Sequence, residues 1–321
     1  MTASSTAYTV SVCCITYNHA AFLAQTIESV LMQETDFAVE MVIGEDCSTD
    51  ATRALAQDYE RRYPGRVRVL ANAHNLGIMS NLMATMAACT GEFVAFLEGD
   101  DYWTDPAKLQ RQVDLLRTRP DAGLCFHDAE IVYEVAPPRP PAIFSQHIAP
   151  HALPAPSLTT APVRFTQAGL AQVGWVVPSA SMLFRASNLP QPLPEWFAGV
   201  FSGDYTLQLL STRHGAAYYL PQLMARYRVH AGSVTVQSAR SERRFQQRIY
   251  EAQMYRQHVF GPENKAYGDV YLAKQYLGYA EFLGAAGRWR ERLSYLIKGW
   301  LLARQRVPLF VRHRLARANG R

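Results

Sequence analysis

Three carboxylates stand within four residues at Glu98-Gly99-Asp100-Asp101, the acidic segment, directly after the apolar run Phe93-Val94-Ala95-Phe96-Leu97. Five consecutive apolar residues predict a strand buried on both faces. In open α/β sheets, ligands bind beyond the carboxyl ends of the strands. Because closely spaced carboxylates repel one another, the acidic segment predicts a bound cation, and a hard divalent ion is the natural candidate.

Other residues suited to chemistry follow other predicted strands. Glu45-Asp46 ends the second apolar run, and His230 follows a late one. Asp204 precedes the apolar helical stretch Leu207–Leu210, where its carboxylate could act as a general base or simply cap the helix. His230 could be a metal ligand, a phosphate contact or an ordinary buried imidazole.

Alternating strands and helices would position these residues. Apolar runs predict strands at 9–15, 39–43, 67–70 and 92–97, and helical spacing predicts helices after Asn18, from 48 to 63, from 81 to 89 and from 104 onward. This alternation continues to about Arg119 and predicts βαβ units with a mostly parallel sheet.

The pattern changes after Arg119. Eight prolines between Pro137 and Pro162 predict a long loop or lid. Strand-like segments return at 175–184 and 223–229, and helical spacing begins near Ser241. We therefore expect a sheet domain over residues 1–235, with the proline-rich loop at 137–162, and a basic helical extension over residues 236–321.

Composition narrows the class of protein. The 321 residues carry a net charge of +5, yet residues 288–321 alone hold ten Lys and Arg and one acid. Trp289, Leu293 and Trp300 recur at helical spacing among these charges, which is typical of a helix on an anionic membrane surface or docked on the body. No nucleic-acid-binding motif accompanies the charge.

The start of the chain and its apolar stretches indicate where the protein is located, and its cysteines indicate which sites to exclude. The short polar start of the chain and the lack of a membrane-spanning apolar stretch predict a cytoplasmic protein, peripheral at the inner membrane face if the basic helix binds lipid. Five cysteines without CxxC spacing argue against a zinc site or a disulfide framework.

Neither GxGxxG nor GxxxxGK[ST] occurs, so phosphates are not expected to sit on a glycine-rich turn. Instead, the chain resembles the family 2 glycosyltransferases of the GT-A fold, which are inverting, metal-dependent users of nucleotide sugars. Five segments carry the resemblance in the family's order: Val12–Asn18, Gly44–Asp50, Asn75–Gly77 with Asn81, Glu98–Trp103 and Tyr227–Ser233.

The resemblance implies roles for these residues. Asp46 would accept the imide N–H of uracil. Asp101 would be the first ligand of Mn²⁺ or Mg²⁺, with Asp100 sharing the metal or binding ribose, and His230 a further ligand. The other implied nucleotide contacts are Thr16, Tyr17, Asn18, Asn81 and Arg228, with Ser233 beside the diphosphate.

The remaining implied roles concern sugar transfer. Asp204 resembles the family's catalytic base, and Gly203 beside it would permit close approach of a substrate. Glu98 stands where family members often have Asp, which leaves a direct or a water-mediated contact open. Trp103, Trp175 and Trp196 could stack on sugar rings or pack in the core.

The expected reaction moves a sugar from a nucleotide diphosphate, most simply a UDP-sugar, to a hydroxyl of a glycan or lipid-linked acceptor in bacterial surface polysaccharide or glycoconjugate synthesis. Two alternatives stay open. A sugar-nucleotide nucleotidyltransferase would need a glycine-rich basic loop near residues 13–18, which is not present. A non-catalytic nucleotide-sugar-binding protein would not need both Asp101 and Asp204.

Overall fold

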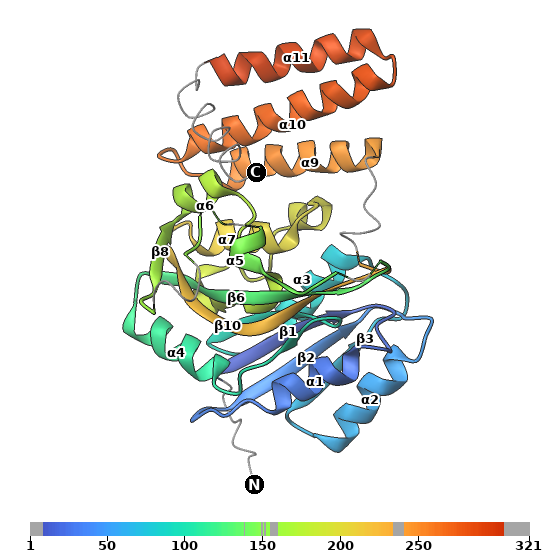
Figure 1. The fold of residues 1–321 in the computed structure, drawn as a ribbon, viewed down its shortest axis with the longest axis vertical. Coiled ribbons are helices and arrows are strands. Elements are labelled where there is room, and N and C mark those ends of the chain that lie inside the picture. Colours follow the sequence, from blue (N-terminus) through green and yellow to red (C-terminus); the bar gives the residue numbers. More distant parts are fainter. Residues whose placement is uncertain are drawn as a thin grey trace.

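The computed structural model describes residues 9–137, 139–148, 150, 152–154, 160–233 and 241–304. A mixed sheet runs through the lower body of the molecule, and three carboxyl-terminal helices are stacked above it (Figure 1). The α/β, GT-A-like architecture with a helical extension agrees with the fold expected from the sequence.

The amino-terminal half forms the predicted parallel sheet. Its four strands lie in the order β3-β2-β1-β4 and are β1 (Val10–Thr16), β2 (Val39–Glu45), β3 (Val67–Ala71) and β4 (Phe93–Glu98). The helices between them are α1 (Leu23–Leu31), α2 (Thr52–Arg62) and α3 (Ile78–Ala88). Alternate β1 side chains enter two separate cores, Val12 one that includes α1 and α2, and Cys13 one that includes α3.

The second half of the sheet departs more from the prediction. Strand β9 (Leu183–Arg185) lies antiparallel between β4 and β6 (Ala122–Glu134), and β10 (Ala216–His230) pairs in parallel with β6. Three short antiparallel strands complete the sheet: β5 (Tyr102–Trp103), β7 (Ala142–Ile143) and β8 (Val163–Thr166).

Two expectations about this half were wrong. Strand β6 was not predicted, because polar residues such as His127 and Asp128 interrupt its apolar run, although both are buried. Most of the strand expected at 175–184 is not extended: Ser179–Ser181 forms a 3-10 turn after Pro178, and only Leu183–Arg185 pairs.

Further helices flank the sheet. They are α4 (Lys108–Thr118), α5 (Phe144–His147), α6 (Gln167–Val173) and α7 (Gly203–Ser211), with 3-10 turns at Ala186–Asn188 and Glu195–Gly199. The proline-rich stretch contains β7 and α5 among its described residues, so it is not wholly loop.

The carboxyl-terminal helices follow the prediction of a helical extension. Helix α9 (Glu242–Met254) continues into a π-helical turn (Tyr255–Val259), and α10 (Lys265–Ala285) and α11 (Trp289–Ala303) stack beyond it (Figure 1). The predicted boundary at residues 235–236 lies outside the described residues. Within the part of the chain that the structure describes, no helix is both long and apolar enough to cross a membrane.

Gly44 in β2 allows α3 to approach the sheet closely. A Cβ atom built at Gly44 would lie 1.9 Å from Oγ1 of Thr85 and 2.7 Å from Oδ1 of Asn81, both on α3. The missing side chain therefore sets the spacing between β2 and α3 just before the strand reaches Asp46.

We expect Gly44→Ala to lower the free energy of unfolding by about 1–3 kcal/mol, because overpacking displaces α3. Urea denaturation followed by circular dichroism measures the change. The double variant Gly44→Ala/Thr85→Ala removes the clashing hydroxyl and should recover part of the loss. Equal stabilities of Gly44→Ala and the unaltered chain would show that the contact does not set the spacing.

Candidate active site

The residues singled out in the sequence gather at one edge of the sheet. Strands β1, β2 and β4 are parallel, so their carboxyl ends bring Thr16, Asp46 and the acidic segment to the same side. Strand β10 ends there at His230, whose ring lies 3.0 Å from Asp100. The site is thus built from residues more than 200 positions apart.

The turn after β1 is fixed to the turn after β2. Asn18 has a positive φ of 56°, donates its backbone N–H to Oγ of Ser48 at 3.0 Å, and accepts the Thr49 N–H at 2.8 Å. Thr16 is buried, and its hydroxyl has no hydrogen-bond partner among the described residues, whereas Tyr17 is 41% exposed. Of the three predicted nucleoside contacts in this turn, Tyr17 and Asn18 are exposed, whereas Thr16 is buried.

Asp46 holds a neighbouring loop in place. Its buried carboxylate accepts the N–H groups of Leu76 at 2.8 Å and Gly77 at 2.9 Å, and the side-chain amide of Asn72 at 2.9 Å. An imide N–H of a base would be a fourth donor to this carboxylate. Its position at the strand end agrees with the predicted role without testing it.

Asn81, one of the predicted nucleotide contacts, is engaged within the protein. Its side chain is buried, donates to the Gly44 carbonyl at 2.8 Å and accepts from Asn72 at 3.0 Å. Asn81 therefore joins α3 to β2 and supports the loop that Asp46 holds.

The three carboxylates of the acidic segment point to three different partners. Glu98 accepts the Ser179 hydroxyl at 2.8 Å, Asp100 contacts His230, and Asp101 accepts the backbone N–H of Arg228 at 2.8 Å. Burial, followed by the charges of Asp100 and Asp204, raises the pKa of Glu98 to about 8. Glu98 is therefore mostly protonated at neutral pH, which relieves part of the repulsion in the segment.

Asp100 lies between two histidines. Its Oδ2 atom is 3.0 Å from Nε2 of His230 and 4.0 Å from Nε2 of His19, and candidate ligand atoms of the three residues all lie within 4.8 Å of one another. Burial opposes ionisation of Asp100, but the His230 hydrogen bond and both imidazoles outweigh it and lower its pKa. Burial also lowers the pKa of His19, which keeps its ring neutral.

This His19–Asp100–His230 cluster has the donor set of a divalent-cation site. Ligand atoms that share one ion at about 2.1 Å are separated by roughly 3–4 Å, close to the spacing found here. Two imidazoles and one carboxylate suit Mn²⁺ better than Mg²⁺, which prefers oxygen ligands alone. The residues present therefore fit a bound Mn²⁺.

The tautomer of His230 is fixed by its own turn. The Gly232 N–H donates to Nδ1 of His230 at 3.1 Å, so a neutral ring carries its proton on Nε2 and donates to Asp100. An ion bound at Nε2 would require the other tautomer and a small rotation away from Gly232. Ser233 supports the same turn, because its hydroxyl accepts the His230 N–H at 2.9 Å.

His19 was not among the residues predicted from the sequence. Its signal was its place three residues beyond β1, at the same sheet edge as the acidic segment. The predicted metal site was based on the acids of that segment instead.

Asp101, the expected first metal ligand, does not belong to this cluster. Its side chain is 1% exposed and faces β10, and burial, with the Asp100 and Glu98 charges, raises its pKa well above the usual range. Of the two aspartates, Asp100 is the one in the His19–Asp100–His230 cluster, and Asp101 attaches β10 to the end of β4.

Arg228, another predicted nucleotide contact, is also engaged within the protein. Its guanidinium donates to Glu134 at 2.9 Å, to Gln25 at 2.6 Å and to the Asp100 carbonyl, and it stacks between Phe22 and Tyr102. With all three nitrogens engaged and the side chain buried, Arg228 holds the backbone of the acidic segment.

Asp204 lies in the first turn of α7, as predicted. Its carboxylate accepts the indole N–H of Trp175 at 2.8 Å, and burial raises its pKa above the ordinary aspartate value. The charges of both Asp100 and Asp204 raise the pKa of Glu98, so the candidate base and the candidate metal cluster both lie near this carboxyl group.

The tryptophan and glycine candidates differ in their exposure and in the groups that they contact. Trp175 is 37% exposed beside Asp204 and stays a candidate for sugar stacking. Trp103 is fully buried, donates to the Ala180 carbonyl and lies under the Lys108 ammonium, while Trp196 stacks on His258. Gly203 makes room for α3 rather than for a substrate, because its Cβ would lie 2.7 Å from Sδ of Met79.

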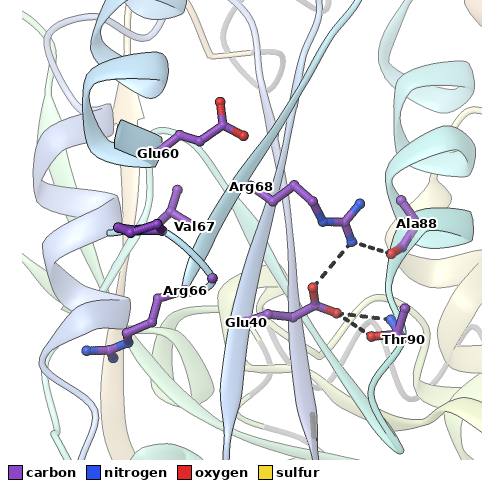
Figure 2. A pocket seen from close by; sticks show the side chains of 9 residues that line it. Glu40, Glu60, Arg66, Val67, Arg68, Ala88 and Thr90 are labelled. Carbon is purple, nitrogen blue, oxygen red and sulfur yellow. Dashed lines mark hydrogen bonds and ion pairs between the residues drawn. The ribbon is translucent and has the colours of Figure 1, made fainter. Parts of the chain in front are cut away.

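A second hollow lies at the opposite edge of the sheet, near the amino ends of β2, β3 and β4. Figure 2 shows Arg68 reaching both Glu40 and the Ala88 carbonyl, with Thr90 bonded to the same Glu40 carboxylate. Because these charged groups already satisfy one another, this pocket is not a candidate active site.

The fold is an α/β sheet that gathers carboxylates and imidazoles at the carboxyl ends of its parallel strands. Residues 11–158 match the family model described as glycosyl transferase family 2. Over these residues the chain is similar to this family, in agreement with the resemblance seen in its motifs.

Individual relatives extend the comparison. An uncharacterized protein of Mycobacterium tuberculosis is 30% identical over 238 residues, 73% of this chain and 63% of that protein. The succinoglycan biosynthesis protein ExoO of Rhizobium meliloti is 37% identical over 98 residues, 30% of this chain and 27% of that protein. The chain thus spans less than two thirds of the length of these relatives.

One solved structure matches nearly the whole chain. S. aureus TarS 1–349 in complex with UDP-GlcNAc has a TM-score of 0.64 and 16% sequence identity, covering 97% of this chain and 88% of that one. At this identity, the likeness establishes a shared fold.

The geometry predicts which residues a metal ion needs. Replacing His19, Asp100 or His230 with Ala should weaken Mn²⁺ binding at least about tenfold, because each change removes one ligand. Isothermal titration with MnCl₂ measures the affinity. Asp101→Asn is the matched control, since it removes an adjacent charge outside the cluster and should weaken binding less. A larger loss in Asp101→Asn than in Asp100→Ala would restore Asp101 as the leading ligand.

Proposed function

We propose that this protein is an inverting, metal-dependent glycosyltransferase that moves a sugar from a UDP-sugar to a hydroxyl of a glycan or lipid-linked acceptor. The observation that carries the proposal is the His19–Asp100–His230 cluster at the carboxyl edge of the sheet, with the buried Asp204 near enough to Glu98 for its charge to raise the pKa of that residue. A cation-binding group and a base are the two parts that such a transfer requires.

The base would act first on the acceptor. The Asp204 carboxylate takes the hydroxyl proton while the acceptor oxygen bonds to the anomeric carbon from the face opposite the diphosphate. The bond from that carbon to the diphosphate breaks, and its electron pair leaves with the phosphate oxygen. Attack from the opposite face inverts the anomeric configuration.

The protein's contribution is mainly position and charge. The Trp175 N–H keeps one Asp204 oxygen oriented, and we assign the nucleoside to Tyr17 and Asp46, which follow β1 and β2 at the same edge of the sheet. A divalent ion held by His19, Asp100 and His230 would neutralise charge on the departing diphosphate. The UDP-GlcNAc complex of TarS and the succinoglycan role in the name of ExoO support a UDP-sugar donor and bacterial polysaccharide synthesis.

Removing the base should abolish transfer while sparing donor binding. Asp204→Asn keeps the shape of the side chain, so kcat should fall about 10²–10⁴-fold with an unchanged donor Kd. UDP release from a panel of UDP-sugars with acceptor and Mn²⁺ measures turnover. Asp105→Asn, at the start of α4, is the matched control and should stay active. An active Asp204→Asn variant would assign the base elsewhere, and turnover unaffected by EDTA would exclude the metal.

The pH profile tests the same residue. A base works only when deprotonated, and burial raises the pKa of Asp204. We therefore expect kcat/KM to fall as the pH drops through a midpoint above the ordinary aspartate value of about 4. The neighbouring acid is Glu98, with its pKa of about 8. An activity constant down to pH 4 would contradict a buried carboxylate as the base.

We also propose that α11 rests on an anionic membrane, where a lipid-linked acceptor would be found. Trp289 (62% exposed), Leu293, Ile297 and Trp300 form one apolar stripe on the outermost helix (Figure 1). Arg292 and Arg304 lie over the Trp289 and Trp300 rings, and the helix's acid, Glu291, is paired with Arg288. Apolar and positively charged groups together match an anionic lipid surface.

Vesicle co-sedimentation tests this surface. The chain should pellet with vesicles of phosphatidylglycerol and phosphatidylcholine, less with phosphatidylcholine alone, and less at high salt. The double variant Trp289→Ser/Trp300→Ser should lose at least about tenfold in partitioning, because two interfacial anchors are gone. Leu223→Ser, which changes an exposed leucine of β10, is the control. Equal vesicle binding of both variants would show that the stripe does not bind lipid. A dimer that depends on the two tryptophans would assign the stripe to contact between two copies of the chain.

A further inference from the structure

The start of helix α7 is held from outside the sheet domain. Ser202, the N-cap residue, makes no capping hydrogen bond with its own side chain in the described structure. The first backbone N–H groups of a helix have no partner within it and need an acceptor. Because Asp204 lies in this first turn, whatever supplies that acceptor also fixes the position of the candidate base.

Glu251 of α9 supplies the acceptor. One of its carboxylate oxygens, Oε2, accepts the N–H of Phe201 at 2.9 Å and the N–H of Ser202 at 2.7 Å. The other, Oε1, accepts the hydroxyl of Tyr271 in α10 at 2.9 Å. The side chain is fully buried, and its negative charge lies at the positive end of the α7 dipole.

The extension contacts this segment on both sides of Asp204. Before it, the Phe201 ring lies between the guanidinium groups of Arg244 and Arg248, at 4.7 and 4.8 Å. After it, the Thr206 hydroxyl is 2.7 Å from the Tyr255 hydroxyl. The extension therefore contacts the whole first turn of α7, and Glu251 supplies a buried polar group in this contact.

Gly199 shows how closely the two parts fit. A Cβ atom built at Gly199 would lie 2.5 Å from Cε1 of Tyr250, and the Tyr250 hydroxyl donates to the Trp196 carbonyl at 3.2 Å. In Figure 1, α9 is the helix of the extension nearest to α7. The loop before the base is thus shaped by α9.

We propose that Glu251 is a positioning residue for the catalytic base, so that the carboxyl-terminal helices form part of the active site. Glu251 holds the backbone of Phe201 and Ser202, and this directs the Asp204 carboxylate toward the acceptor. The inference rests on the proposed role of Asp204 as the base. It assigns to a buried acid outside the family-matched residues 11–158 a function in sugar transfer.

The chemistry of Glu251 permits a graded test. Burial raises its pKa to about 7, with Tyr271, Tyr255, Tyr205 and Arg248 as its titratable neighbours. Glu251→Gln keeps a carbonyl oxygen for the two loop amides, whereas Glu251→Ala removes the acceptor. Tyr271→Phe removes the third hydrogen bond of the same carboxylate but leaves both loop amides bonded.

The experiment compares these three variants with the unaltered chain at saturating UDP-sugar and Mn²⁺. Glu251→Ala should lower kcat by about 10²-fold, because a base displaced by about 1 Å transfers protons poorly, while the donor Kd changes less than about twofold. Glu251→Gln should recover most of the lost kcat. Tyr271→Phe should lower the melting temperature without lowering kcat, which separates positioning from general stability.

The outcomes distinguish the two proposals. If Asp204→Asn abolishes transfer while Glu251→Ala, folded by circular dichroism, keeps its kcat, the positioning role of Glu251 is wrong and the base assignment stands. If Tyr271→Phe loses kcat as much as Glu251→Ala, the effect is structural and the inference fails. If Glu251→Ala does not fold, Glu251→Asp and Tyr271→Phe decide: the shorter carboxylate of Glu251→Asp should lower kcat and Tyr271→Phe should not, so a Glu251→Asp variant that keeps its kcat overturns the inference. If Asp204→Asn is fully active, Asp204 is not the base, and the proposed function is contradicted whatever the Glu251 variants show.

Discussion

The structure depends on the separation of three carboxylates at the buried end of β4. Left together, Glu98, Asp100 and Asp101 would repel one another in a medium that screens charge poorly. Each instead has its own partner: the Ser179 hydroxyl, the two imidazoles and the Arg228 amide. These partners come from separate elements, so satisfying the acidic segment requires the turn after β1, the turn before β9 and the far end of β10 to meet.

Strand β10 is the element most constrained by this requirement. Its backbone binds Asp101, the Arg228 side chain binds the Asp100 carbonyl, and His230 binds the Asp100 carboxylate. Breaking one partner of a buried charge generally costs more than the pair contributes, since the remaining charge is left unsolvated. The end of β10 is therefore held by a network, which gives His230 a defined position without a cofactor present.

Much of this could be predicted from the sequence, because β1 to β4 are local apolar runs and their parallel order brings Asp46 and the acidic segment to one edge. The separate role of each residue at this edge could not be predicted. Adjacent residues in a turn point in different directions, so sequence alone does not tell Asp100 from Asp101. Asn81, Arg228 and Trp103 resemble ligand contacts until their buried partners are known. Strand β6 was missed because the partners that satisfy its Asp128, such as Ser145, lie elsewhere in the chain.

The length of β10 has a consequence for how the chain can be divided. The family match ends at residue 158, which suggests a self-contained amino-terminal module. Yet a fragment ending there would leave the Asp101 carboxylate without its amide and the Asp100 carboxylate without His230. Such a fragment would expose the edge of β4 that pairs with β9, and it would leave Asp100 and Asp101 without their partners on β10. The amino-terminal half is thus not an autonomous building block, and recombination between relatives would have to exchange both halves together.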